Sequence, residues 1–145
     1  MPTKVAEILQ QKGYEVVTVT ATQMIESVVA VLTENRIGAT PVLDENGEMV
    51  GIISERDIIR GLSQQGAVVL RLPAEQLMTR EVTTCSPADA VVELMETMTN
   101  RRIRHLPVVE NNRLRGIVSI GDVVKQRLAE GQFELEELRK YVQSS

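Results

Sequence analysis

Two copies of one short motif carry the side chains best suited to chemistry in this chain. GIISERDIIR, residues 51–60, and GIVSIGDVVK, residues 116–125, each place Ser and Asp three residues apart, directly after an apolar run. A carboxylate at the end of a buried strand can accept hydrogen bonds from both hydroxyls of a ribose. The serine hydroxyl, and the N–H groups of a helix that begins there, can donate to a phosphate. The motif therefore indicates a site that binds a nucleoside but does not catalyse a reaction on it.

The same spacing also has a purely structural interpretation. Ser as N-cap and Asp at the third helical position form a capping box, and the Asp carboxylate also favours the positive end of the helix dipole. Two features favour a binding role besides capping. Each copy is predicted to lie where a buried strand gives way to a helix, and the two copies belong to repeated segments that are expected to pack as a pair around a shared cleft.

The two motifs belong to a longer internal duplication. Residues 16–59 align with residues 82–124, with a single deletion in the turn after the second strand of each repeat. Pro41 matches Pro107, and Ile37 matches Ile103. The order of β-branched runs and helical patterns predicts β-α-β-β-α in each repeat.

Each repeat is predicted to open with a short strand and a helix. The β-branched runs at residues 16–19 and 82–85 favour strands. Thr20 and Ser86 are predicted N-caps of the helices that follow. Apolar residues at helical spacing predict one buried face in each helix. These residues are Ile25, Val28, Val29, Leu32, Val91, Leu94, Met95 and Met98.

Composition excludes several classes of protein. The chain has 145 residues, is 43% hydrophobic and 25% charged, and carries a net charge of −4, so attraction to nucleic acid is not expected. No apolar run approaches the ~20 residues that span a bilayer. The polar N-terminus and the single cysteine, Cys85, favour a cytoplasmic protein. Cys85 aligns with Val19 and is expected to be a buried small hydrophobe.

Taken together, the paired repeats resemble a tandem pair of CBS (cystathionine β-synthase) domains, often called a Bateman module. The segments TPVLDENGEMVGIISERDII and LPVVENNRLRGIVSIGDVV carry the resemblance, which covers about residues 3–126. It implies an α+β fold with repeats at residues 1–66 and 67–126, related by a pseudo-twofold axis, and a C-terminal helix at residues 127–145.

The resemblance also implies a function. Stand-alone members of the family are regulatory and non-catalytic, dimerise, and bind adenosine-containing ligands. AMP, ADP or ATP is the expected ligand of this chain, with S-adenosylmethionine or NAD(H) as alternatives. We expect a homodimer, with an unidentified regulated protein as a further partner, and no metal, nucleic acid or membrane. The alternatives are an NAD(H)-binding redox sensor and a structural dimer with vestigial clefts.

The family's binding positions carry over to two clefts. Asp122 and Ser119 would hold ribose and phosphate in one cleft, whose opposite wall comes from the first repeat: Thr18, Ile37, Gly38, Ala39 and Pro41. Asp57 and Ser54 take these roles in the other, against a wall from the second repeat: Thr83 or Thr84, Ile103, Arg104, His105 and Pro107. Arg56 makes this second cleft more cationic, so we expect tighter phosphate binding there.

Two stretches keep two interpretations each. The basic run at residues 101–105 is either a solvated loop or a phosphate contact through Arg104 and His105. The tail after residue 126 carries a helical apolar stripe, which either covers the chain's own core or packs on another subunit. The stripe consists of Leu128, Leu135, Leu138 and Val142. We favour a contribution to the dimer.

Overall fold

The computed structural model describes residues 2–144, leaving aside the side chains of residues 133, 134, 137, 141 and 144. These residues form two compact units. The first-repeat unit contains residues 15–84 and 109–115. The second-repeat unit contains residues 2–14, 85–108 and 116–144. Each is built around one of the two sequence repeats.

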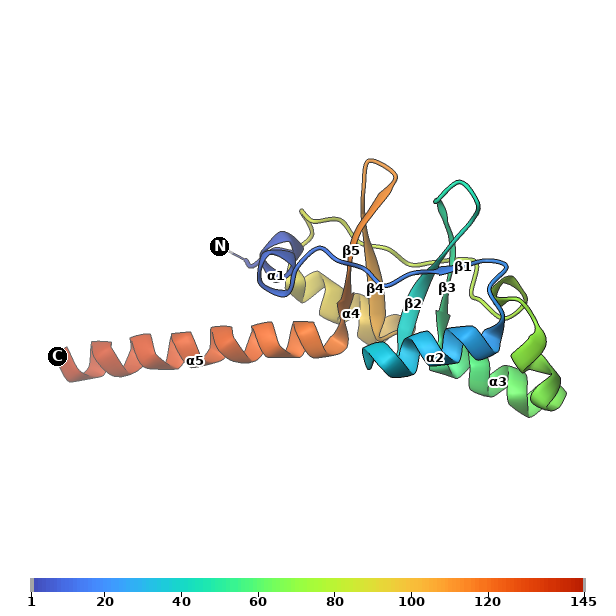
Figure 1. The fold of residues 1–145 in the computed structure, drawn as a ribbon. Helices are drawn as coiled ribbons and strands as arrows, with labels where there is room; N and C mark the ends of the chain where they lie inside the picture. Colours follow the sequence, from blue (N-terminus) through green and yellow to red (C-terminus); the bar gives the residue numbers. More distant parts are fainter. Residues whose placement is uncertain (1, 145) are drawn as a thin grey trace. The chain divides into compact units, whose positions relative to one another are not determined.

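A three-stranded sheet forms the frame of the first-repeat unit. Its order is β1 (Val19–Thr20), β2 (Ala39–Leu43), β3 (Met49–Ser54), with β1 parallel and β3 antiparallel to β2. Helices α2 (Ile25–Asn35) and α3 (Glu55–Gln65) lie at the end of the β2–β3 hairpin away from its turn (Figure 1). The mixed helix and strand content confirms the predicted α+β class.

The second-repeat unit contains the corresponding elements with a reduced sheet. Strands β4 (His105–Glu110) and β5 (Arg113–Ser119) pair with each other, and Cys85 forms a single parallel bridge to Val108. The predicted first strands are therefore shorter than residues 16–19 and 82–85. Helices α4 (Val91–Arg101) and α5 (Ile120–Ser144) complete the repeat.

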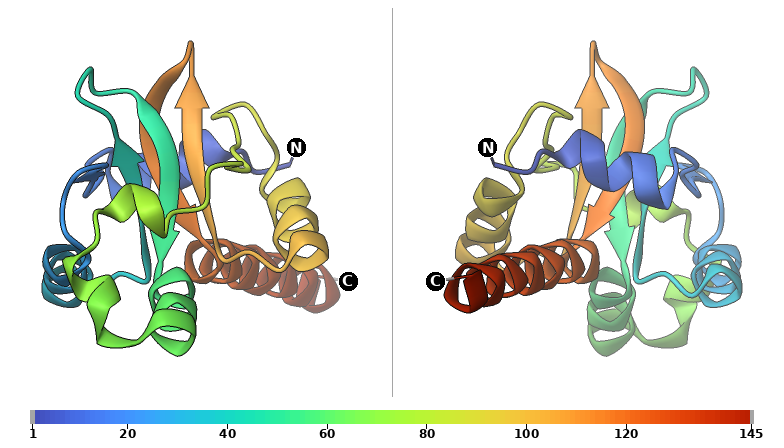
Figure 2. Two further views of the ribbon diagram at one scale, coloured as in Figure 1. Left: turned by 90° about the vertical axis from the view of Figure 1, so that its right-hand side faces the viewer. Right: turned by 90° about the vertical axis from the view of Figure 1, so that its left-hand side faces the viewer.

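Each unit also includes a segment that immediately precedes the other unit's repeat in the sequence. Helix α1 (Val5–Lys12) packs in the second-repeat unit, where Val5, Ile8 and Leu9 join the core, and it lies across β4 and β5 (Figure 2). The short 3-10 helices η1 (Gly66–Arg71) and η2 (Ala74–Gln76) pack in the first-repeat unit. Each segment contains one antiparallel bridge, from Lys4 to Ala90 just before α1 and from Pro73 to Met24 just before η2.

The buried helical faces agree with the sequence pattern at all positions but one. In α2 the buried residues are Ile25, Val28 and Leu32, whereas Val29 is 36% exposed and does not belong to the core face. In α4 they are Val91, Leu94 and Met98, with Met95 packed against them. Cys85 is buried, as predicted.

The predicted start of α2 is wrong. The backbone N–H of Thr20 does bond the side chain of Gln23, but this contact closes a turn. The helix begins later, at Ile25, with Met24 as its N-cap. Met24 is extended and bridges to Pro73, so the chain cannot enter a helix before this point.

The predicted start of α4 is wrong for the same reason. The backbone N–H of Ser86 donates to Asp89 at 2.8 Å, and this too closes a turn. The helix begins at Val91, because Ala90 is extended and bridges to Lys4. In both repeats a strand-like contact from a distant segment decides where the helix begins.

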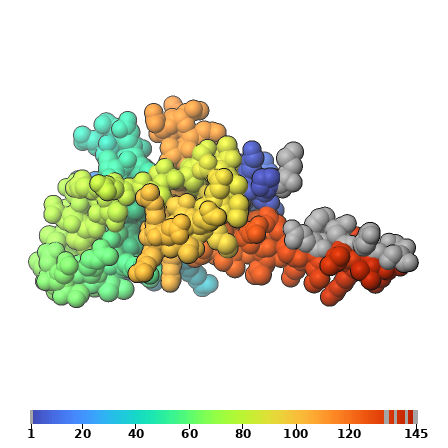
Figure 3. All heavy atoms as spheres, turned by 180° about the vertical axis from the view of Figure 1, so that it is seen from behind, coloured from blue at the N-terminus to red at the C-terminus, as the bar shows by residue number. Residues whose placement is uncertain are grey.

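Helix α5 is the longest element of the chain. It opens in the second motif and continues without a break through Gly131 to Ser144, 25 residues in all. Its C-terminal half extends beyond the other elements of its unit (Figures 1 and 3). Within the described part of the chain, no helix combines the length and apolar character needed to cross a membrane.

Candidate functional site

The first motif is a complete capping box at the start of α3. The N–H and hydroxyl of Ser54 donate to Oδ2 of Asp57 at 2.9 and 3.0 Å, and the Asp57 N–H donates to Ser54 Oγ at 3.3 Å. Thr79 Oγ1 donates to Oδ1 of Asp57 at 3.2 Å. Asp57 is only 8% exposed. The predicted capping role is thus confirmed, and this carboxylate is largely buried.

The second motif has the same reciprocal bonds and a different partner. The Ser119 N–H donates to Oδ2 of Asp122 at 2.9 Å, and the Asp122 N–H donates to Ser119 Oγ at 3.2 Å. Lys12, the last residue of α1, donates from Nζ to Asp122 Oδ2 at 2.6 Å and to the Ile117 carbonyl at 2.8 Å. A hollow of about 80 Å³ opens beside this ion pair.

Both motifs leave one backbone donor unpaired at the same position. The first N–H of each helix bonds a carbonyl of the preceding loop, Glu55 to Gly38 at 3.0 Å and Ile120 to Arg104 at 2.8 Å. The third is taken by the motif serine. The second, which belongs to Arg56 in α3 and to Gly121 in α5, has no hydrogen-bond partner among the described residues. A helix N-terminus with such a donor favours an anion.

The wall residues of the first repeat lie next to the motif of the same repeat. Ala39 pairs with Ser54 between the strands, and Pro41 pairs with Ile52. The carbonyl of Gly38 accepts a hydrogen bond from the first N–H of α3. Ile37 is half-buried between α2 and this strand, and Thr18 directly precedes β1. The structure thus places Gly38, Ala39 and Pro41 beside the carboxyl end of β3, with Thr18 across β2 from it.

The second repeat has the same arrangement. Arg104 is exposed, and its carbonyl accepts a hydrogen bond from the first N–H of α5. His105 is half-buried and is the first residue of β4. The Pro107 carbonyl accepts from the N–H of Cys85, and Ile103 packs against the core. Thr83 and Thr84 belong to the first-repeat unit and precede this bridge. Which wall serves which motif stays a prediction.

Sequence reasoning missed Lys12 and Thr79, the partners of the two motif carboxylates. Lys12 is 110 residues from Asp122 in the chain, and Thr79 is 22 from Asp57. No local spacing in the sequence shows that α1 and the segment around η2 would each place a donor on a motif carboxylate.

The environment of Asp122 lowers its pKa. Burial alone would raise the pKa, but the hydrogen bonds from Lys12 and Ser119 and the positive charge of Lys12 outweigh it, so it lies below the ordinary value. Because the folded-state pKa is depressed, this group stabilises the fold above its unfolded-state pKa. That contribution is lost as the pH falls through the folded-state pKa.

Replacing Lys12 with methionine is expected to raise the pKa of Asp122, because the burial remains when the cation and its hydrogen bond are gone. The stability that Asp122 contributes above its unfolded-state pKa should then be smaller, and its loss should be complete at a higher pH. A carboxyl NMR titration measures the pKa. Lys125→Met is the matched control, since Lys125 borders the same hollow but is not bonded to Asp122. An unchanged pKa in Lys12→Met would contradict this account.

Neither thiol chemistry nor a metal centre finds support in the geometry. Burial, with a smaller contribution from the charge of Asp89, raises the pKa of Cys85 to about 12, so its reactive thiolate is scarce. Among the described residues, no group of three or more His, Cys, Asp or Glu side chains could hold a metal ion.

A comparison with known protein families assigns the chain to one of them. The family model of the CBS domain matches residues 5–64 and again residues 74–129. The protein therefore belongs to the CBS domain family and carries a tandem pair of these domains, as the sequence predicted.

Relatives and solved structures agree with this assignment. The mitochondrial CBS domain-containing protein CBSX3 of Arabidopsis thaliana is 32% identical over 97% of this chain and 72% of its own length. The crystal structure of a CBS-domain containing protein from Agrobacterium tumefaciens is similar with a TM-score of 0.84 at 43% identity, covering 88% of this chain and 95% of the other.

Two similar structures contain adenosine compounds. A CBS domain protein from Pyrobaculum aerophilum, complexed with AMP, has a TM-score of 0.74 at 30% identity over 83% of this chain and 89% of its own. A CBS domain pair in complex with 5′-methylthioadenosine and S-adenosyl-L-methionine has a TM-score of 0.77 at 30% identity over 91% of this chain and 99% of its own.

Proposed function

We propose that this protein is a non-catalytic regulator that binds an adenine nucleotide, AMP, ADP or ATP, at its Ser-x-x-Asp motifs. The observation that carries the proposal is the repeated geometry of the two motifs. In each motif the aspartate directly follows a residue whose backbone N–H is unpaired at the start of a helix. This residue is Arg56 in the first motif and Gly121 in the second. The AMP complex of the Pyrobaculum protein supports this ligand class.

Each part of the motif matches one part of a nucleotide. An ionised carboxylate is an acceptor for several hydrogen bonds, so Asp57 and Asp122 can accept from ribose hydroxyls while they hold the helix cap. The free N–H of Arg56 or Gly121 can donate to a phosphate oxygen. At Gly121 an added Cβ would meet only Ser119 Oγ, at 3.6 Å, so no other side chain crowds the backbone at this position.

The two motifs differ in the cations that they offer to a phosphate. Arg56 is exposed beside Asp57, and we retain Arg104 and His105 as predicted phosphate contacts. Lys12 adds a cation beside Asp122 that was not predicted from the sequence. Charge-assisted hydrogen bonds of this kind are roughly twice as strong as neutral ones. They favour a phosphorylated nucleoside over adenosine, and over the cationic sulfonium of S-adenosylmethionine.

We further propose that the protein acts as a homodimer, so that ligand binding can be coupled to assembly or to a regulated partner. Large apolar side chains on the helices of both units remain exposed, among them Ile59 at 63% and Leu128 at 63%. Exposed apolar surface of this kind is typical of protein interfaces.

The proposal predicts that an adenine nucleotide stabilises the fold. Ligand at 100 times its Kd adds about 2.7 kcal/mol to the free energy of unfolding. For a chain of this size that corresponds to a rise in Tm of roughly 5–10 °C. Thermal unfolding with AMP, ADP, ATP, NADH and S-adenosylmethionine measures it, with GMP as the matched control. If no adenosine compound shifts the Tm at millimolar concentration, the proposed function is wrong.

A further inference from the structure

We propose that α5 forms a parallel two-stranded coiled coil with α5 of a second copy of this chain. This inference rests on the homodimer in the proposed function, and it names the surface and the orientation through which two copies meet. It does not depend on which ligand the motifs bind.

The spacing of one stripe on α5 is the first argument. Val124, Leu128, Gly131, Leu135, Leu138 and Val142 follow each other at intervals of four, three, four, three and four residues. This is the heptad alternation of coiled coils, with Leu128, Leu135 and Val142 at a positions and Val124, Gly131 and Leu138 at d positions. A helix that only covers its own core follows the 3.6-residue period and drifts from this register.

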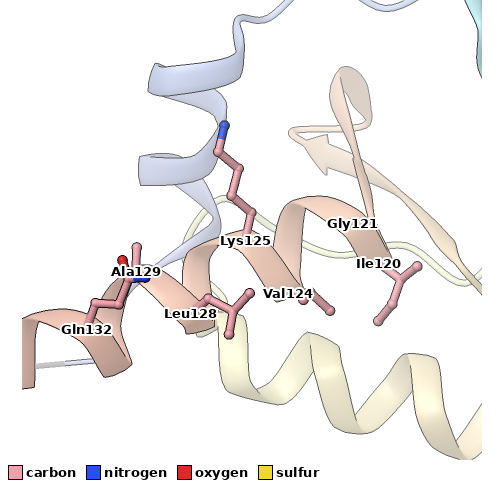
Figure 4. A pocket seen from close by; sticks show the side chains of 7 residues that line it. All are labelled: Ile120, Gly121, Val124, Lys125, Leu128, Ala129 and Gln132. Carbon is pink, nitrogen blue, oxygen red and sulfur yellow. The ribbon is translucent and has the colours of Figure 1, made fainter. Parts of the chain in front are cut away.

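The second argument is that the second-repeat unit leaves this stripe uncovered. Val124 is 41%, Leu128 63%, Leu135 49% and Leu138 58% exposed. The start of the stripe borders a hollow of about 590 Å³ on α5, lined by Val124 and Leu128 among others. Figure 4 shows these two side chains pointing to the same side of the helix, with Lys125 on another side. The alternative that the stripe covers the chain's own core is thereby disfavoured.

Charges beside the stripe favour the parallel direction. In a parallel pair, a g position faces the e position five residues later on the partner helix, which sets Arg127 opposite the uncharged Gln132. In an antiparallel pair, e faces e, so that Lys125 would meet Arg139 and like charges would be opposed. The charges of the described residues thus disfavour the antiparallel orientation.

Cysteine crosslinking tests the contact and its direction. Leu138→Cys places a thiol at a d position, where a parallel pair brings the two copies together. Lys140→Cys, on the opposite face of the same helix, is the matched control. The natural Cys85 is buried and does not compete. We expect mild oxidation to link most Leu138→Cys chains into dimers and few Lys140→Cys chains.

Other crosslinking outcomes overturn the proposal. No link through Leu138→Cys, or equal linking by both variants, shows that the stripe is not an interface. Preferential linking between Leu128→Cys and Leu138→Cys chains in a mixture shows an antiparallel pair, because only that orientation opposes these positions.

Sedimentation separates this inference from the proposed function. Leu135→Glu with Leu138→Glu is expected to weaken the dimer at least tenfold, whereas Lys140→Glu, on the polar face, leaves it unchanged. If the doubly substituted chain keeps its dimerisation constant, the dimer uses another surface and the coiled coil is wrong. If the unmodified chain is a monomer at tens of micromolar, the homodimer itself is wrong. Nucleotide binding is tested independently by the thermal shift.

Discussion

Replacing Gly51 with alanine is expected to lower the free energy of unfolding by about 2–3 kcal/mol, a large part of the roughly 5–15 kcal/mol of a typical domain. A Cβ at this position would lie 2.6 Å from Sδ of Met78 and 2.9 Å from the backbone oxygen of Thr79. The Thr79 oxygen cannot retreat freely, because it accepts a hydrogen bond from the Ile52 N–H at 3.0 Å. Chemical denaturation measures the loss.

The equivalent change in the second repeat should cost less. At Gly116 the added Cβ would meet only side-chain atoms of Leu9, the nearest at 2.7 Å, and these can shift or be shortened. Combining Gly116→Ala with Leu9→Val should therefore cost less than the sum of the two single changes. Gly131→Ala is the matched control, since nothing lies within 4 Å of a Cβ there, and it should add roughly 1 kcal/mol of helix stability. Equal losses at Gly51 and Gly116 would refute this steric account.

Replacing Asp57 with alanine is expected to weaken both the fold and nucleotide binding at its motif. An exposed carboxylate in the first turn of a helix contributes about 0.3–1 kcal/mol to stability. Asp57 is buried and accepts three hydrogen bonds, so its loss should cost about 1–3 kcal/mol instead. Losing the ribose contact should cost a further 1.5–3 kcal/mol in affinity, roughly ten- to a hundredfold.

Two control variants separate the two roles of Asp57. Thr79→Ala removes one donor to the carboxylate but leaves the capping box and the proposed ribose contact, so affinity should persist. Asp122→Ala makes the same change at the second motif, where the side chain is 24% exposed and stability should fall less. Denaturation and calorimetry report the two effects. If Asp57→Ala loses stability but keeps the wild-type affinity and stoichiometry, the motif is a helix cap alone.

The sequence by itself determined the features that rest on local spacing. The duplication and the capping boxes at Ser54 and Ser119 can both be recognised from residue types and their spacing. Local conformation also explains the end of α3, because Gly66 has a φ of 79°, which glycine adopts without strain. Short-range hydrogen bonds need no knowledge of the rest of the chain, so they can be recognised from residue types alone.

Only the tertiary structure decided where α1 and the segment of η1 and η2 pack. Their packing determined the partners of the two motif carboxylates and the starts of α2 and α4. Burial of the apolar face of α1 in the second-repeat unit brings Lys12 to Asp122, and burial of Ala74 and Met78 brings Thr79 to Asp57. The same segments hold the residues before α2 and α4 in extended conformation, which delays both helices beyond their predicted caps. The physical reason is that hydrophobic burial is non-directional. An apolar stripe shows that a segment must be covered, and only the packed fold shows by what.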